Sequence, residues 1–311
     1  MSKTNRTLDL QVNGYDGVDF NADELDSGEV QRACQSMCKD GVAGILATVI
    51  TNDIDAMVRR LSNICQVRES HQDIADIIWG IHIEGPFLNG QPGYIGAHPP
   101  HAARPADLDL MNRLLEAAGG LTKIVTLAPE CDTGFQVTQE LADQGIVVSA
   151  GHCNPTLDQL QGAIDAGLSM ITHLGNGCPL EMHRHDNVIQ RVLSLSDQLW
   201  IGFIADGVHV PFPALGNYLD MAGTDHSFVV TDAIEAAGRG PGTYRIGGQT
   251  VVVDEQLATW AEDKSHLVGS AMTMPLAIAN LRNHLRLDAE QIDDLTRGNP
   301  SRAIGLPVDP I

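Results

Sequence analysis

The chain has 311 residues, a hydrophobic share of 43% and a formal net charge of -21 at pH 7. No apolar run approaches the roughly 20 residues that a membrane helix needs, so we expect no membrane association. The acidic excess disfavours nucleic acid and anionic membranes as partners, because both need basic patches that neutralise phosphate groups. The start, MSKTNRT, lacks the apolar stretch of a secretory signal, which predicts a cytoplasmic protein.

Eight short β-rich runs alternate with helical patterns along the chain. This alternation indicates a parallel sheet, and eight is the number of strands that closes a barrel. We therefore predict an α/β fold of the (β/α)8 TIM-barrel type that forms one domain over residues 1–311. The runs are LDLQVNG (8–14), VAGILATVI (42–50), DIIWGIHIEG (76–85), KIVTLAPE (123–130), IVVSAGH (146–152), SMITHLG (169–175), WIGFIAD (200–206) and SFVVTDA (227–233).

Helical patterns occupy several of the intervals, and three of them end in or near a glycine, which commonly closes a helix. Residues 239–250 are rich in glycine, which is typical of a loop, with a possible hairpin into the apolar TVVVD. The helical segments are 27–40, 156–167 and 213–223, and a closing segment covers 270–285.

The cysteines are scattered and form no CxxC pair, so neither a disulfide framework nor a structural zinc knuckle is expected. Reduced thiols are the predicted state. The six residues are Cys34, Cys38, Cys65, Cys131, Cys153 and Cys178.

Four polar residues, Glu84, His152, His173 and Asp232, each end one of the predicted strands. In barrels of this type the active site is built at the carboxyl ends of the strands. Two imidazoles and one carboxylate form a known catalytic metal set with an open position, in which a bound water is acidified toward a pKa of about 7. Asp232 is the candidate general base. The pattern predicts a metal-dependent hydrolase, with zinc favoured and iron, manganese or cobalt as alternatives.

Each residue also has a structural interpretation. A lone histidine at a strand end is more often a packing residue, and Asp232 alone would serve equally as a helix cap. The joint placement of the four residues favours the metal site. His82 lies two residues before Glu84 on the same side of the strand, which makes it an alternative ligand, but we favour a supporting or packing role for it. Cys153 and Cys178 lie beside ligand candidates and are alternative ligands for a soft metal, but thiols without a fixed spacing are weak evidence, so we favour structural or incidental cysteines.

Six segments in this order, GIHIEGPFLN, VTLAPE, SAGHCNPT, THLGNG, IADGVHV and VTDAIEAAG, resemble the N-acetylglucosamine-6-phosphate deacetylases of the amidohydrolase superfamily. The likeness extends from Leu8 to about Leu306 and includes the closing GNPSRAIGL. It implies hydrolysis of the acetamide of an amino-sugar phosphate to acetate and a free amine.

The resemblance also implies roles for individual residues. Glu84, His152 and His173 correspond to the metal ligands and Asp232 to the general acid and base. The stretch GYIGAHP is similar to the family loop whose histidine polarises the substrate carbonyl, which assigns that role to His98.

Many superfamily members carry an HxH pair on the first strand that holds a second metal, whereas this chain has Gln11 and Asn13. Amides are poor zinc ligands, so we expect a single metal ion. Gln11 is a candidate to face the sugar. An amide that only makes hydrogen bonds with other groups of the barrel mouth is an equal alternative.

For the phosphate, the family pattern corresponds to the backbone of Asn176 and Gly177, to Arg184 in MHRHDN and to His209. In the family, the arginine and that histidine reach a neighbouring subunit's site, so the resemblance implies a homodimer. The alternative for Arg184 is that it has no role in binding and is simply a solvated charged residue on a loop.

Two departures from the family pattern keep other substrates open. HLGNGCP replaces an HLFNAM-like segment beside the phosphate loop, and the small β-sandwich of family members is expected to be absent. One alternative is therefore an amidohydrolase for another acetylated amino sugar or a cyclic amide. A second alternative is a non-catalytic sugar-phosphate-binding homologue.

Overall fold

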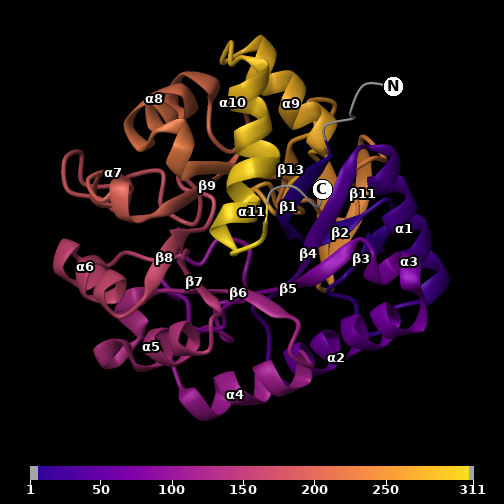
Figure 1. Cartoon of the computed structure of the whole chain (residues 1–311), viewed down its shortest axis with the longest axis horizontal. Coiled ribbons are helices and arrows are strands. Elements are labelled where there is room, and N and C mark those ends of the chain that lie inside the picture. Colours follow the sequence, from indigo (N-terminus) through magenta and orange to yellow (C-terminus); the bar gives the residue numbers. More distant parts are fainter. Residues whose placement is uncertain (1–5, 308–311) are drawn as a thin grey trace.

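Eight parallel strands form the centre of the protein, whose computed structural model describes residues 6–307. They are hydrogen-bonded in the order β1-β4-β5-β6-β7-β8-β9-β10 and enclose a nearly closed barrel (Figure 1). Each of the eight predicted runs overlaps one of these strands, so the predicted barrel is confirmed. The strands are β1 (Thr7–Val12), β4 (Val42–Ile50), β5 (Ile78–Glu84), β6 (Thr122–Leu127), β7 (Val147–Ala150), β8 (Leu168–Ile171), β9 (Trp200–Ile204) and β10 (Ser227–Val230).

Helices surround the barrel and cover its outer face (Figure 1). The four predicted helical segments are confirmed as α1, α6, α8 and α9, with ends within a few residues of those expected. The helices are α1 (Ser27–Lys39), α2 (Ile54–Ser70), α3 (Gln72–Ala75), α4 (Leu108–Ala117), α5 (Gln136–Asp143), α6 (Leu157–Asp165), α7 (Val188–Leu193), α8 (Phe212–Ala222), α9 (Met274–Asn283), α10 (Ala289–Asp293) and α11 (Asn299–Ala303). None of the helices within residues 6–307 is both long and apolar enough to cross a membrane.

Local sequence explains where the elements begin. All nine residues of β4 are buried, as expected for a parallel strand covered on both faces. Helix α6 begins with a capping box, in which the Thr156 hydroxyl accepts the backbone N–H of Gln159 and the Gln159 side chain accepts that of Thr156.

A buried carboxylate links β1 and β10, the two edge strands of the nearly closed barrel. Asp9 accepts the backbone N–H of Thr231 at 3.2 Å and the Thr231 hydroxyl at 2.5 Å. Immediately beyond, the N–H of Asn13 donates to the carbonyl of Ala233 at 2.7 Å. These contacts join the first strand to the segment that carries Asp232.

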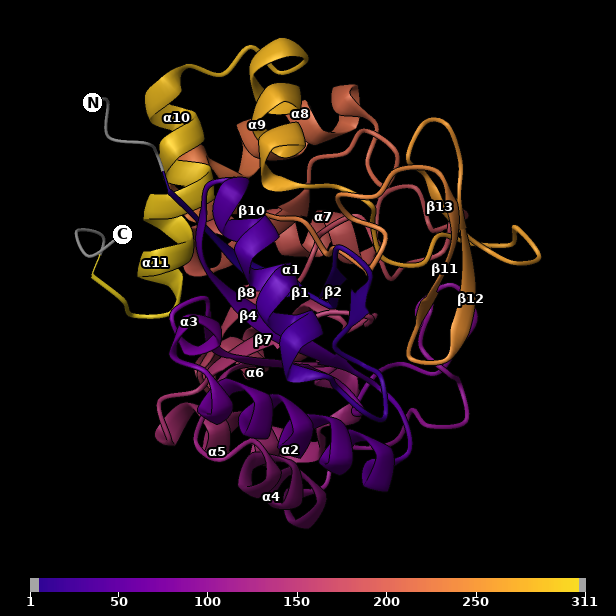
Figure 2. The same cartoon turned by 90° about the vertical axis from the view of Figure 1, so that its right-hand side faces the viewer.

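A small antiparallel sheet stands beside the barrel (orange in Figure 2) and consists of β11 (Gly242–Ile246), β12 (Gln249–Val253) and β13 (Thr259–Ala261). The expected hairpin is confirmed, but the loop prediction for 239–250 is wrong over β11. The strand forms because Ile246 is buried in a second apolar cluster with Ile50 and Ile234 of the barrel. A further two-stranded hairpin, β2 (Gly14–Tyr15) and β3 (Val18–Asp19), follows β1. That residues 1–311 form one domain without a β-sandwich stays a prediction.

Candidate active site

Four strand ends deliver the predicted residues to one mouth of the barrel. Glu84 is the last residue of β5. His152 lies two residues after the end of β7, His173 two residues after β8, and Asp232 two residues after β10. All four side chains are buried. His152, His173 and Asp232 have positive φ angles of 51°, 31° and 51°. Such conformations cost about 1–3 kcal/mol each and cluster at functional sites.

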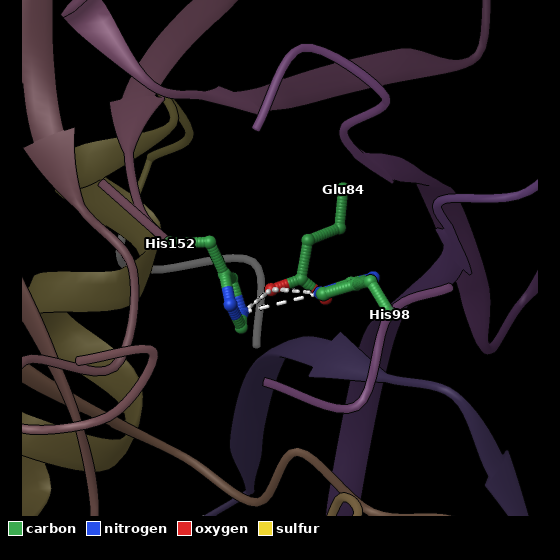
Figure 3. A group of neighbouring side chains, drawn as sticks. All are labelled: Glu84, His98 and His152. Carbon is green, nitrogen blue, oxygen red and sulfur yellow. Dashed lines mark hydrogen bonds and ion pairs between the residues drawn. The ribbon is translucent and has the colours of Figure 1, made fainter. Parts of the chain in front are cut away.

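The imidazoles converge on one carboxylate oxygen. Oε1 of Glu84 lies 3.1 Å from Nε2 of His173 and 3.3 Å from Nε2 of His152. His98, from the loop between β5 and α4, brings its Nε2 to 3.2 Å from that of His152 and 4.0 Å from Glu84 Oε1. Figure 3 shows Glu84, His98 and His152 pointing toward one another.

These separations fit a bound metal ion. Ligand bonds of about 2.0–2.1 Å in a tetrahedron place neighbouring ligand atoms roughly 3.3 Å apart. Glu84, His98 and His152 are placed to hold a metal, since their ligand atoms all lie within 4.8 Å of one another. His173 also contacts Glu84 at this spacing, but this group of three contains His98 where the predicted ligand set has His173.

Neighbouring groups prepare the ligands. Nδ1 of His152 lies 2.9 Å from the carbonyl oxygen of Tyr94 and donates to it, which leaves the Nε2 lone pair directed at the site. Although burial opposes it, hydrogen bonds from His152 and His173 hold the pKa of Glu84 well below its usual value. Burial and the neighbouring His152 lower the pKa of His98 to about 3, so its ring is neutral.

Asp232 is set apart from Glu84 by its environment. Its Oδ1 accepts a hydrogen bond from the side-chain amide of Asn13 at 2.7 Å. Burial, and then the charge of Glu84, raise the pKa of Asp232 to about 6. A carboxylate with a pKa near neutrality can both take up and release a proton at physiological pH, as a general acid and base must.

Gln11 faces the ligand cluster. Its side-chain amide donates to both oxygens of Glu84, at 3.3 and 3.2 Å. It therefore holds the orientation of the carboxylate, and contact with a sugar stays a prediction.

The predicted phosphate residues lie on two loops around the mouth. Asn176 is held by a hydrogen bond from its side chain to the carbonyl of His173. Gly177 has a φ of 60°, and a Cβ there would lie 2.8 Å from Nδ1 of His152, so only glycine fits. Arg184 is exposed on the loop between β8 and α7, whereas His209 is mostly buried after β9.

Sequence reasoning missed two supporting residues. Asn13 was recognised only as a replacement for a histidine, although its position at the end of β1 places it against Asp232. Asp206 pairs with His209, with Oδ2 2.5 Å from Nδ1, and their spacing of three residues in DGVH is the available signal.

His82, Cys153 and Cys178 lie outside the group of candidate metal ligands. Nε2 of His82 is 2.7 Å from the Thr126 hydroxyl. The thiols of Cys153 and Cys178 are not among the metal-ligating groups of residues 6–307.

The known proteins that this chain resembles are deacetylases of amino-sugar phosphates. No protein-family model matches the chain. It is 30% identical over 302 residues to the N-acetylglucosamine-6-phosphate deacetylase of Bacillus subtilis, covering 96% of this chain and 74% of that protein. The enzyme of the same name from Mus musculus is 33% identical over 308 residues, with coverage of 96% and 73%. The N-acetylgalactosamine-6-phosphate deacetylase of Escherichia coli O157:H7 is 27% identical over 299 residues, with coverage of 96% and 77%.

Solved structures agree with the sequence comparison. The N-acetyl-D-glucosamine-6-phosphate deacetylase of Mycobacterium smegmatis superimposes with a TM-score of 0.87 at 29% identity, covering 97% of this chain and 78% of that one. A mutant of the same enzyme in complex with N-acetyl-D-glucosamine-6-phosphate gives 0.87 at 28% identity, with coverage of 97% and 77%. The chain thus spans about three quarters of the length of these relatives.

Proposed function

The chain belongs to the family of N-acetylglucosamine-6-phosphate deacetylases, and we propose that it hydrolyses the acetamide of N-acetylglucosamine-6-phosphate to acetate and glucosamine-6-phosphate. The observation that carries the proposal is the convergence of Glu84, His152 and His173 at the barrel mouth that also holds Asp232. A sugar-binding homologue without activity has no use for a buried ligand set beside a carboxylate whose pKa is near neutral.

We assign the metal to Glu84, His152 and His173, with zinc as the favoured ion. Glu84 ends its strand and the two histidines lie two residues beyond theirs, with both imidazoles within 3.3 Å of Glu84 Oε1. A divalent cation held there supplies positive charge that polarises the amide carbonyl and acidifies a water molecule.

The remaining chemistry belongs to side chains of this protein. Asp232 accepts a proton from the water that attacks the carbonyl carbon and later delivers it to the nitrogen of the leaving amine. Asn13 holds Asp232 in place for both transfers. His98 is neutral and donates a hydrogen bond to the carbonyl oxygen as negative charge develops there.

Phosphate recognition and assembly belong to the same proposal. Asn176 and Gly177 present the loop backbone, and His209 is oriented by Asp206. The exposure of Arg184 suits a residue that completes the site of a second subunit, so the proposed assembly is a homodimer in the cytoplasm.

The deciding experiment measures acetate and amine release by purified, metal-loaded protein. The substrates are N-acetylglucosamine-6-phosphate, its galactosamine epimer and both unphosphorylated sugars, because one relative is named for the epimer. We expect turnover of a phosphorylated sugar and one bound metal per chain. Absence of acetate release from every sugar phosphate, in protein with a full metal complement, contradicts the proposal.

A further inference from the structure

A cavity of about 350 Å³ lies outside the site described above. Its walls are the segment after β3, helix α2, and the turn between β11 and β12. None of its lining residues belongs to the site described above. Its volume is within the range of pockets that bind small molecules, roughly 300–1,000 Å³.

Arg60 on α2 is the residue of this cavity that indicates a bound ligand. The residue is only 5% exposed, yet its Nε and Nη1 atoms have no hydrogen-bond acceptor among the described residues. Its ion-pair partner, Asp23, lies 3.5 Å from Nε and is 64% exposed. Buried charged donors are normally satisfied, so these N–H groups point to an acceptor that another molecule supplies.

Carboxylates line the cavity together with Arg60. Oδ2 of Asp19 accepts the N–H of Gly247 at 2.7 Å, and Oε1 of Glu235 accepts that of Arg245 at 2.5 Å. An ionised carboxylate offers about four acceptor positions, so both retain capacity for further donors. Burial raises the pKa of Asp19 to about 6 and also raises that of Glu235.

The charge balance selects the class of ligand. Six carboxyl side chains and two guanidinium groups line the cavity, which disfavours a phosphate or another anion. Within residues 6–307, the group of three ligand atoms placed to hold a metal contains Glu84 and no residue of this cavity. A hydroxyl group, by contrast, both accepts and donates a hydrogen bond.

We propose that the cavity binds an unphosphorylated sugar of hexose or hexosamine size. Hydroxyl oxygens of the sugar accept hydrogen bonds from the Arg60 guanidinium. Hydroxyl or ammonium groups of the sugar donate hydrogen bonds to Asp19 and Glu235. This site is separate from the proposed catalytic site and does not depend on the catalytic assignment.

The turn beside this cavity connects it to the catalytic loop. Gly247 and Gly248 line both the Arg60 cavity and a neighbouring cavity that His98 lines. The next residue, Gln249, donates from its side-chain amide to the carbonyl of Ala97 at 2.9 Å. The contacts of Asp19 with Gly247 and of Gln249 with Ala97 therefore lie on one turn, between the cavity and the loop that carries His98.

The test is calorimetric titration of the full, metal-loaded chain with glucosamine, with glucose and with inorganic phosphate. The test variant is Arg60→Met and the control is Arg59→Met, because exposed Arg59 pairs with the same Asp23 at 3.7 Å. We expect saturable binding of at least one sugar, weakened roughly tenfold or more in Arg60→Met and unchanged in the control.

Other outcomes overturn the site. These are no saturable binding of either sugar, equal binding by Arg60→Met, or binding of phosphate in preference to both sugars. If Arg60→Met fails to fold, Glu235→Gln tests the same cavity, and a sugar affinity equal to that of the wild type contradicts the proposal. Acetate release is measured separately on each protein, so a failure of the proposed catalytic function is distinguishable from a failure of this one.

Discussion

The side-chain amide of Gln11 holds both carboxylate oxygens of Glu84, at 3.3 and 3.2 Å. An amide is a poor zinc ligand, so Gln11 supports a ligand instead of binding a metal itself. Groups in such supporting positions fix ligand orientation, and their loss typically weakens metal binding by about 10–100-fold.

Gln11→Ala is therefore expected to lower metal affinity by about 10–100-fold, with activity recovering at saturating metal. Competition with a chelator of known affinity measures the change. Gln91→Ala is the matched control, because Gln91 is exposed in the loop that carries His98. Unchanged affinity in Gln11→Ala would show that Glu84 needs no such support.

Asp232→Asn removes the proposed proton acceptor without changing the size of the side chain. We expect turnover to fall by about 10²–10⁴-fold, the usual contribution of general acid and base catalysis. Metal content, measured by elemental analysis, should equal that of the wild type. Near-normal turnover, or loss of the metal, would assign Asp232 to another role.

The pH dependence of turnover follows from the same residue. The pKa of Asp232 is raised to about 6, and only its ionised form accepts a proton from water. A bound cation opposes this rise by favouring the ionised form, so we expect turnover to fall on the acid side with an apparent pKa of about 6 or below. Turnover measured from pH 4 to pH 9 with metal held in excess tests this. A rise in activity below pH 5 would contradict the assignment.

The eight strands and the residues at their ends were predictable because each strand is a local apolar run, with its polar residue directly after it. His98 is different, since it lies in a loop rich in glycine and proline whose path depends on contacts with distant segments. Its burial beside Glu84 was accessible only through the family resemblance. The strand β11 was missed because apolar packing against Ile50, far away in the sequence, overrides its local glycine-rich composition.

The loop that carries His98 is held from the small sheet. Gln249 of β12 donates to the carbonyl of Ala97, and Ala97 packs on the apolar cluster beneath that sheet. Gln249→Ala is expected to lower kcat by about tenfold with a smaller change in KM, because misplacing a catalytic group mainly affects the transition state. Steady-state kinetics measures both constants, and exposed Gln256→Ala is the control. A change confined to KM would assign Gln249 to substrate binding.

The buried Asp9 predicts how stability depends on pH. Burial raises its pKa from 3.8 to about 7, despite hydrogen bonds from Thr231 that oppose the rise. The folded state therefore holds this proton more tightly than the unfolded state. The stabilisation is fully present below about pH 4 and is lost as the pH rises through about 7.

The asparagine in Asp9→Asn is uncharged at all these pH values, so the free energy of unfolding of this variant should not decrease in this way as the pH rises. Each unit of pKa difference corresponds to about 1.4 kcal/mol, so the wild type should lose a few kcal/mol relative to the variant across that window. Urea unfolding of metal-free protein at several pH values measures the difference, with exposed Asp143→Asn as the control. Parallel stability curves for Asp9→Asn and the wild type would mean that Asp9 is ionised at the barrel seam. The contacts from Thr231 would then outweigh the cost of burying its charge.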